Sequence, residues 1–139
     1  MTSALRFRLD SDTFKRNQDV DLDFKNSVCK CTLNQTTSTP GMRLRNTIEL
    51  SKGDYELIVT AKASKEEIFF LWVYDSKTNT RIGGTLHVGV EKEKLALGFS
   101  LLENTKIEFG VLAHNHEIGD YCEIEFVEIQ QQKIMHLHQ

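Results

Sequence analysis

The sequence has little proline, few cysteines and no long apolar run. One proline, Pro40, and eight glycines among 139 residues exclude collagen-like and proline-rich chains. No apolar stretch approaches the roughly 18 residues of a membrane-spanning helix, so we expect no membrane insertion. The N-terminus also lacks the apolar segment of a signal peptide. The remaining composition, 40% hydrophobic and 27% charged, is that of one ordinary globular domain.

The charge balance argues against nucleic acid as a partner. The net charge is −3, whereas domains that bind nucleic acid are usually basic. Positive charge gathers near the start, since residues 1–52 carry nine Lys and Arg against six Asp and Glu. Residues 53–139 carry eight Lys and Arg against fourteen Asp and Glu. We therefore predict that the chain does not bind nucleic acid.

The three cysteines do not form the pattern of a secreted disulfide framework, because their number is odd and Cys29 and Cys31 are separated by one residue. On a strand these two would point to the same side, as small buried hydrophobes. Together with Cys122 they are expected to be reduced. This indicates intracellular synthesis or a module from a larger chain, and the final location is unknown.

Apolar side chains recur at every second position along most of the chain. Leu57, Val59 and Ala61 are one example, and the same period returns in 95–101 and 107–113. Alternation of this kind indicates half-buried β-strands, and no window has the period of an amphipathic helix. The predicted strands are 4–9, 18–24, 27–33, 43–50, 54–62, 67–75, 80–90, 94–102, 106–113 and 121–130.

Many short strands separated by turn residues predict an all-β fold, a two-sheet antiparallel β-sandwich with jelly-roll-like topology. We expect one domain over residues 1–130. Residues 131–139 would form a flexible C-terminal tail.

The segment 50–59 resembles a recurrent sequence pattern of carbohydrate-binding-module-like β-sandwiches. In that pattern a strand ends at a glycine and an aromatic residue opens the next strand, as Gly53 and Tyr55 do here. Residues 69–75 and 78–82 look like their strand, turn and strand. The stretches 99–101, 107–111 and 119–124 are similar to their closing strands. The resemblance covers residues ~43–130 and is shared with galactose-binding-like domains. It implies a non-catalytic module that binds a glycan or glycoconjugate, often with one structural Ca²⁺, for which Asp120 is the candidate ligand.

The predicted strand 67–75 is unusual because both of its faces are apolar. A sandwich strand normally turns one face to the core and the other to water. If Phe69, Leu71 and Val73 point inward, as the resemblance suggests, then the alternate side chains of this strand point outward. We call that set the aromatic row: Phe70, Trp72 and Tyr74.

Small residues on other strands are expected beside these rings and would leave a shallow groove. They are Thr85, Gly89, Ala96, Gly98, Ser100 and Gly110. Several uses of the aromatic row stay open: a ligand groove, a buried core surface, or a surface covered by residues 1–33 or by another subunit.

The first functional hypothesis is a non-catalytic carbohydrate-binding module. In this hypothesis Trp72, with Phe70 or Tyr74, stacks on a sugar ring. Loop residues form hydrogen bonds with the sugar hydroxyls, and one of two arginines binds an acidic sugar. The loop residues are His114, Asn115 and His116, and the arginines are Arg43 and Arg45.

The alternative hypothesis is a structural or assembly protein, such as a viral or appendage component. There the same aromatic row would be the subunit interface of a homo-oligomer.

Catalysis finds little support in the sequence. The chain has no G-x-S-x-G, no P-loop, no G-x-G-x-x-G and no H-E-x-x-H. The pair His114 and His116 lacks the glycine and glutamate spacing of the cupin metal motif. We therefore expect no enzyme activity, although the chain could be a non-catalytic module of a larger carbohydrate-active enzyme. We expect no cofactor other than the calcium ion.

Overall fold

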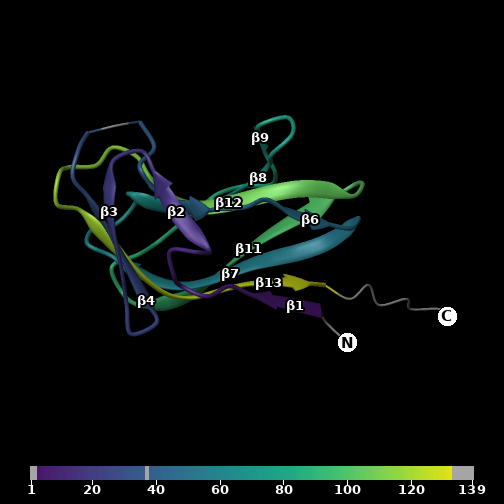
Figure 1. Ribbon diagram of the computed structural model, residues 1–139, viewed down its shortest axis with the longest axis horizontal. Helices are drawn as coiled ribbons and strands as arrows, with labels where there is room; N and C mark the ends of the chain where they lie inside the picture. Colours follow the sequence, from purple (N-terminus) through teal and green to yellow (C-terminus); the bar gives the residue numbers. More distant parts are fainter. Residues whose placement is uncertain (1–2, 37, 133–139) are drawn as a thin grey trace.

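The chain folds into two facing layers of β-strands (Figure 1). The computed structural model describes residues 3–36 and 38–132, and every regular element within them is a strand. In this described part, no helix is long and apolar enough to cross a membrane. All strand pairs are antiparallel. The predicted all-β, two-sheet antiparallel sandwich is confirmed.

One layer, the six-stranded sheet, is built around two long central strands of 11 residues each, β7 and β13. In spatial order its path is β11 (Glu93–Leu101), β7 (Gly53–Ala63), β13 (Tyr121–Gln131), β4 (Val28–Leu33) and β3 (Val20–Lys25). The short β1 (Ser3–Arg6) pairs with the end of β13.

The other layer, the seven-stranded sheet, is centred on β12. Its path is β10 (Leu86–His87), β8 (Phe69–Asp75), β12 (Thr105–Ala113), β5 (Gly41–Leu44) and β2 (Phe14–Asn17). β6 (Ile48–Leu50) pairs with β12, and β9 (Thr80–Arg81) pairs with β8.

The core lies between the inner faces of the two sheets, where period-two alternation places the apolar residues. Phe69, Leu71 and Val73 of β8 have no exposed surface. At the edge near β2, the rings of Phe7 and Phe109 meet edge-on with centroids 5.0 Å apart. Burial of this apolar surface is the main stabilising contribution to the fold.

The sequence prediction differs from the structure in three places. The predicted strand 43–50 is interrupted, because β5 ends at Leu44 and β6 begins at Ile48. The predicted strand 80–90 contains only the two-residue strands β9 and β10. β2 was not predicted, since Phe14 is the one apolar residue among its four. The tail prediction is tested only at its start, where β13 extends to Gln131, because residues 133–139 lie outside the described residues.

The loop before β13 is tied to the end of β7 through Asp120, which is 5% exposed. One carboxylate oxygen accepts a bond from the Glu117 N–H at 2.9 Å. The other accepts from the Ser64 hydroxyl at 3.3 Å and lies 3.3 Å from Lys65 Nζ. Burial alone would raise the pKa of Asp120, but these bonds outweigh it and lower the pKa below its ordinary value of 3.8.

The three cysteines are free and buried, so we predict thiols that do not react in the folded protein. Burial raises the pKa of Cys29 to about 12 and also raises the pKa of Cys31 and Cys122. Only the thiolate is a good nucleophile. A chromogenic disulfide reagent should therefore detect three thiols per chain in denaturant. In the native protein the same reaction should be many-fold slower. Rapid reaction of any thiol in the native protein would contradict this.

Asp120→Asn should lower the free energy of unfolding by about 1–3 kcal/mol at pH 7, because it weakens charged hydrogen bonds at a buried group. The lowered pKa also sets a pH dependence. Its stabilisation is complete above the unfolded pKa of 3.8 and is lost as the pH falls through the lower folded value. Urea titrations between pH 2 and 7 should show a smaller loss of stability below pH 4 in the variant.

The matched control is Glu117→Gln. Glu117 also contacts Lys65, at 2.8 Å, but its side chain is 80% exposed. An exposed ion pair adds little stability, so this variant should unfold like the parent chain. Equal losses in both variants would show that the buried position of Asp120 is not what matters.

Candidate functional site

β8 turns its second apolar row to the outer surface of the seven-stranded sheet. Phe69, Leu71 and Val73 point into the core, so the intervening Trp72 and Tyr74 lie on the opposite face and are half-buried. This surface is the candidate functional site. It lies on the upper side of the molecule in Figure 1, where the β8–β9 turn stands above the sheet.

The aromatic row is a continuous chain of ring contacts. Phe70 and Trp72 have centroids 4.8 Å apart, and Trp72 and Tyr74 are 6.1 Å apart. Phe70 is only 4% exposed, because the imidazoles of His87 and His114 cover it, with centroids at 6.0 and 4.8 Å. Trp72 and Tyr74 are therefore the rings that a ligand could reach, and Phe70 supports them from below.

Gly110 on β12 is the direct cross-strand partner of Trp72, and β5 packs closely against it on the other side. A Cβ atom at Gly110 would lie 2.6 Å from the carbonyl oxygen of Met42, so a side chain there would push β5 away. Three of the other small residues predicted beside the rings lie elsewhere. Ala96, Gly98 and Ser100 are on β11, in the opposite sheet, because strand alternation alone does not reveal sheet membership.

A charged pair adjoins the rings on the same face. Arg43 is the partner of Gly110 on β5, and its Nη1 lies 3.1 Å from Oε1 of Glu108. Glu108 is in turn opposite Tyr74. Burial and the negative charge of Glu108 raise the pKa of Tyr74, so its hydroxyl keeps its proton at neutral pH.

The β8–β9 turn forms a wall beside Trp72. The turn is held by Asp75, whose carboxylate accepts the N–H groups of Lys77 and Thr78 at 2.9 and 3.3 Å. It encloses a hollow of about 270 Å³ between the sheet and the turn. The lining residues are Trp72, Tyr74, Asn79 and Arg81.

Two donors on this face have no partner among the described residues. They are Nε1 of Trp72 and Nε of Arg43, and both atoms are buried. Buried donors are nearly always satisfied in native proteins, and each one left unpaired costs about 1–3 kcal/mol. Both atoms are closed to solvent, so an oxygen acceptor would reach them only if neighbouring side chains moved.

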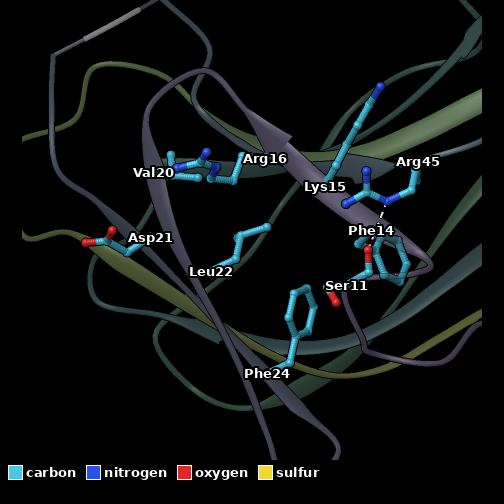
Figure 2. Close-up of a pocket in the computed structure, with 9 residues that line it drawn as sticks. All are labelled: Ser11, Phe14, Lys15, Arg16, Val20, Asp21, Leu22, Phe24 and Arg45. Atoms are coloured by element: carbon cyan, nitrogen blue, oxygen red, sulfur yellow. Dashed lines mark hydrogen bonds between the residues drawn. The ribbon is translucent and has the colours of Figure 1, made fainter.

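Arg45, although two residues from Arg43, belongs to a different hollow. It follows the end of β5, and its Nε donates to the Ser11 carbonyl at 2.9 Å. Figure 2 shows this hollow, of about 560 Å³, between β2 and β3, with Leu22 and Phe24 pointing into it. Phe14 there has no exposed surface and so offers no ring face to a ligand.

The His-Asn-His segment does not act as one unit. His114 lies over Phe70 on the aromatic face, and Asn115 is exposed at a left-handed backbone position with φ 49°. His116 is buried, and its Nε2 lies 3.1 Å from the carbonyl oxygen of Gln35. Of the three predicted loop residues, His114 is the one that contacts the aromatic row.

Calcium binding at Asp120 stays a prediction. Its carboxylate oxygens already accept hydrogen bonds from the Ser64 hydroxyl and the Glu117 backbone N–H and contact the Lys65 ammonium. Within residues 3–36 and 38–132, no three His, Cys, Asp or Glu side chains form a group that could hold a metal ion.

The sequence analysis missed four polar residues of this face: Asn79, Arg81, His87 and Glu108. A usable signal existed for Arg81. A four-residue hairpin loop over 76–79 would place Arg81 opposite Tyr74, as observed. No local signal placed His87 beside Phe70, because the break at 82–85 between β9 and β10 shifts the register of their pairing with β8 by two residues.

The fold matches solved structures but no known sequence family. No family model matches the chain, and no curated protein does either. The xylan-binding domain CBM22-1 of Xyn10C from Paenibacillus barcinonensis superposes with a TM-score of 0.68 at 12% identity, over 94% of this chain and 95% of that one.

Two further structures are similar. A CBM4 structure has a TM-score of 0.71 at 12% identity, over 87% of this chain and 96% of that one. The second N-terminal cellulose-binding domain of β-1,4-glucanase C from Cellulomonas fimi has a TM-score of 0.63 at 14% identity, over 93% and 97%. At such identities the match concerns architecture. The chain has the β-sandwich fold of carbohydrate-binding modules.

Proposed function

We propose that this chain is a non-catalytic carbohydrate-binding module that holds a glycan against the outer face of the seven-stranded sheet. The observation that carries the proposal is the pair of half-buried rings, Trp72 and Tyr74, which line a hollow together with Asn79 and Arg81. The C–H bonds on one face of a sugar ring are slightly positive. They pack well on the negative face of an aromatic ring.

The polar groups around the rings suit the sugar hydroxyls. Trp72 Nε1 and Arg43 Nε are buried donors without partners in the described residues, and Asn79 and Arg81 line the adjoining hollow. A few placed polar groups around an apolar surface is the usual composition of a small-molecule site. Because most of these groups are donors, the face favours ligands rich in oxygen acceptors.

Arg43 is the arginine that belongs to this proposal. It lies on the same face as Trp72, whereas Arg45 lines the hollow between β2 and β3. Glu108 partly neutralises the charge of Arg43, so Arg81 is the better candidate for binding an acidic sugar. Arg81 forms no ion pair within the described part of the chain.

The similar structures support the ligand class. One neighbour is named as xylan-binding and another as cellulose-binding, and both share this architecture over most of their length. A shared fold does not determine a ligand, so the proposal depends on the rings and donors described above.

Trp72→Ala should weaken glycan binding by about thirtyfold or more, since an aromatic anchor at a binding hot spot contributes about 2 kcal/mol or more. Affinity gel electrophoresis with soluble xylan, hydroxyethylcellulose and laminarin would measure the retardation of each variant. Tyr121→Ala is the matched control. Tyr121 is also half-buried, but it lies in β13 of the opposite sheet. The control should bind like the parent chain.

The same proteins test the alternative, in which the aromatic row is a subunit interface. Light scattering after size exclusion gives the mass of the parent chain and of Trp72→Ala. A glycan-binding monomer whose retardation disappears only in Trp72→Ala supports the proposal. An oligomer that Trp72→Ala dissociates, without retardation by any of the glycans, overturns it in favour of an assembly protein.

A further inference from the structure

The hollow between β2 and β3 has no part in the proposed function. β2 is the last strand on one side of the seven-stranded sheet, and β3 is the last strand on one side of the six-stranded sheet. In the described part of the chain, no further strand closes the gap between these two edges. The space measures about 560 Å³, a size that suits a small ligand or a short piece of a long one.

The floor of the hollow is apolar and partly open. Val20, Leu22 and Phe24 lie on one side of β3 and pack against the core. Val20 is fully buried, whereas Leu22 and Phe24 are only half-buried and point into the hollow (Figure 2). A ligand with an apolar face can therefore cover carbon surface here.

Two exposed arginines border the hollow. Arg16 lies on the same side of β2 as Phe14, because the two are separated by one residue. Arg45 donates its backbone N–H to the Thr13 carbonyl at 2.8 Å and its Nε to the Ser11 carbonyl at 2.9 Å. The Nε bond orients the guanidinium of Arg45 without using its two terminal nitrogens.

The charge that faces the hollow is positive. Neither Arg16 nor Arg45 forms an ion pair in the part of the chain that the structure describes. Asp21 is the one acidic residue among the described residues that border the hollow, and Lys15 borders it too. Strand alternation turns both of these side chains to the outer faces of the sheets, and Figure 2 shows both pointing away from Leu22.

The two arginines are set apart along β2. Arg45 is bonded at Thr13, which is three residues from Arg16. A strand rises about 3.4 Å per residue, so the two backbone positions are about 10 Å apart. This separation favours an extended ligand with two or more anionic groups over one with a single anionic group, such as a fatty acid.

We propose that this hollow binds an oligouronate, a glycan whose sugars carry carboxylates. The carboxylates pair with Arg16 and Arg45, since a guanidinium can hold a carboxylate through two parallel N–H bonds. The C–H faces of the sugar rings cover Phe24 and Leu22. The site is separate from Trp72, so it does not depend on the proposed function.

An acidic peptide fits this place less well. Peptides often bind by adding a strand to a free sheet edge. The free edge at β3 carries Asp21 and Asp23, both exposed, and like charges on neighbouring strands repel. A glycan that lies in the hollow, on the other side of β3, avoids these two carboxylates.

Titration calorimetry of the full chain with hexagalacturonate and with hexamannuronate tests the site, in about 0.15 M salt to screen distant charges. At least one of the two should bind, with one oligosaccharide per chain. Arg16→Gln and Arg45→Gln should each weaken binding at least about tenfold, because each removes a charge-assisted pair. Arg45→Lys should also weaken it, because lysine keeps the charge but lacks the planar fork.

Lys15→Gln is the matched control, because it removes one positive charge from the neighbouring position that points to the outer face. It should bind like the parent chain, and so should Trp72→Ala. The methyl ester of the same oligosaccharide, which has the sugar rings without the charges, should not bind.

Four results would overturn the proposal. They are no binding of either oligouronate, equal weakening in Lys15→Gln and Arg45→Gln, binding of polyglutamate as tight as that of the oligouronate, and loss of oligouronate binding in Trp72→Ala alone. Retardation by neutral glycans is measured separately, so failure here leaves the function proposed for Trp72 and Tyr74 untouched.

Discussion

Burial of Phe69, Leu71 and Val73 between the sheets is the constraint on which the candidate site depends. These three side chains are fully buried, and a strand points successive residues to opposite faces. Trp72 and Tyr74 must then lie outside. A shift of β8 by one residue would exchange the two sets and put the large rings into a core already filled by Phe109 and its neighbours. The outward position of the rings is therefore a consequence of core packing.

The two ends of the aromatic row have different roles because they have different neighbours. Phe70 is covered by two imidazoles and is almost fully buried, so its ring stabilises the face but is not accessible to a ligand. Trp72 stays partly open, because it lines the hollow that also contacts Tyr74, Asn79 and Arg81. A Cβ atom at its β12 partner Gly110 would lie 2.6 Å from the Met42 carbonyl, so β5 leaves no room there for a larger residue. This glycine thus lets β5 and Arg43 lie close to β12.

Alternation within the strands predicted the fold, and the resemblance to carbohydrate-binding modules predicted which face of 67–75 points inward. Sequence reasoning did not reach properties that depend on which strands are neighbours. Gly98 alternates as Gly110 does, yet it lies in the opposite sheet. Arg43 and Arg45 look equivalent until the chain leaves β5 after Leu44. His87 comes to Phe70 because the break at 82–85 shifts the pairing with β8 by two residues. Pairing over long distances is not encoded in any short window, so these residues could not be placed from the sequence.

The buried donors on the outer face lower the stability of the unliganded fold. The described residues provide no acceptor for Trp72 Nε1 or Arg43 Nε, and Glu108 is already bonded to another nitrogen of Arg43. Each unpaired donor costs free energy in the unliganded fold, whereas apolar atoms of similar shape would not. A ligand oxygen that reaches them removes this cost on binding. Combined with ring surfaces that accept a sugar face, these donors would make the interaction selective for hydroxyl-rich ligands over purely apolar ones.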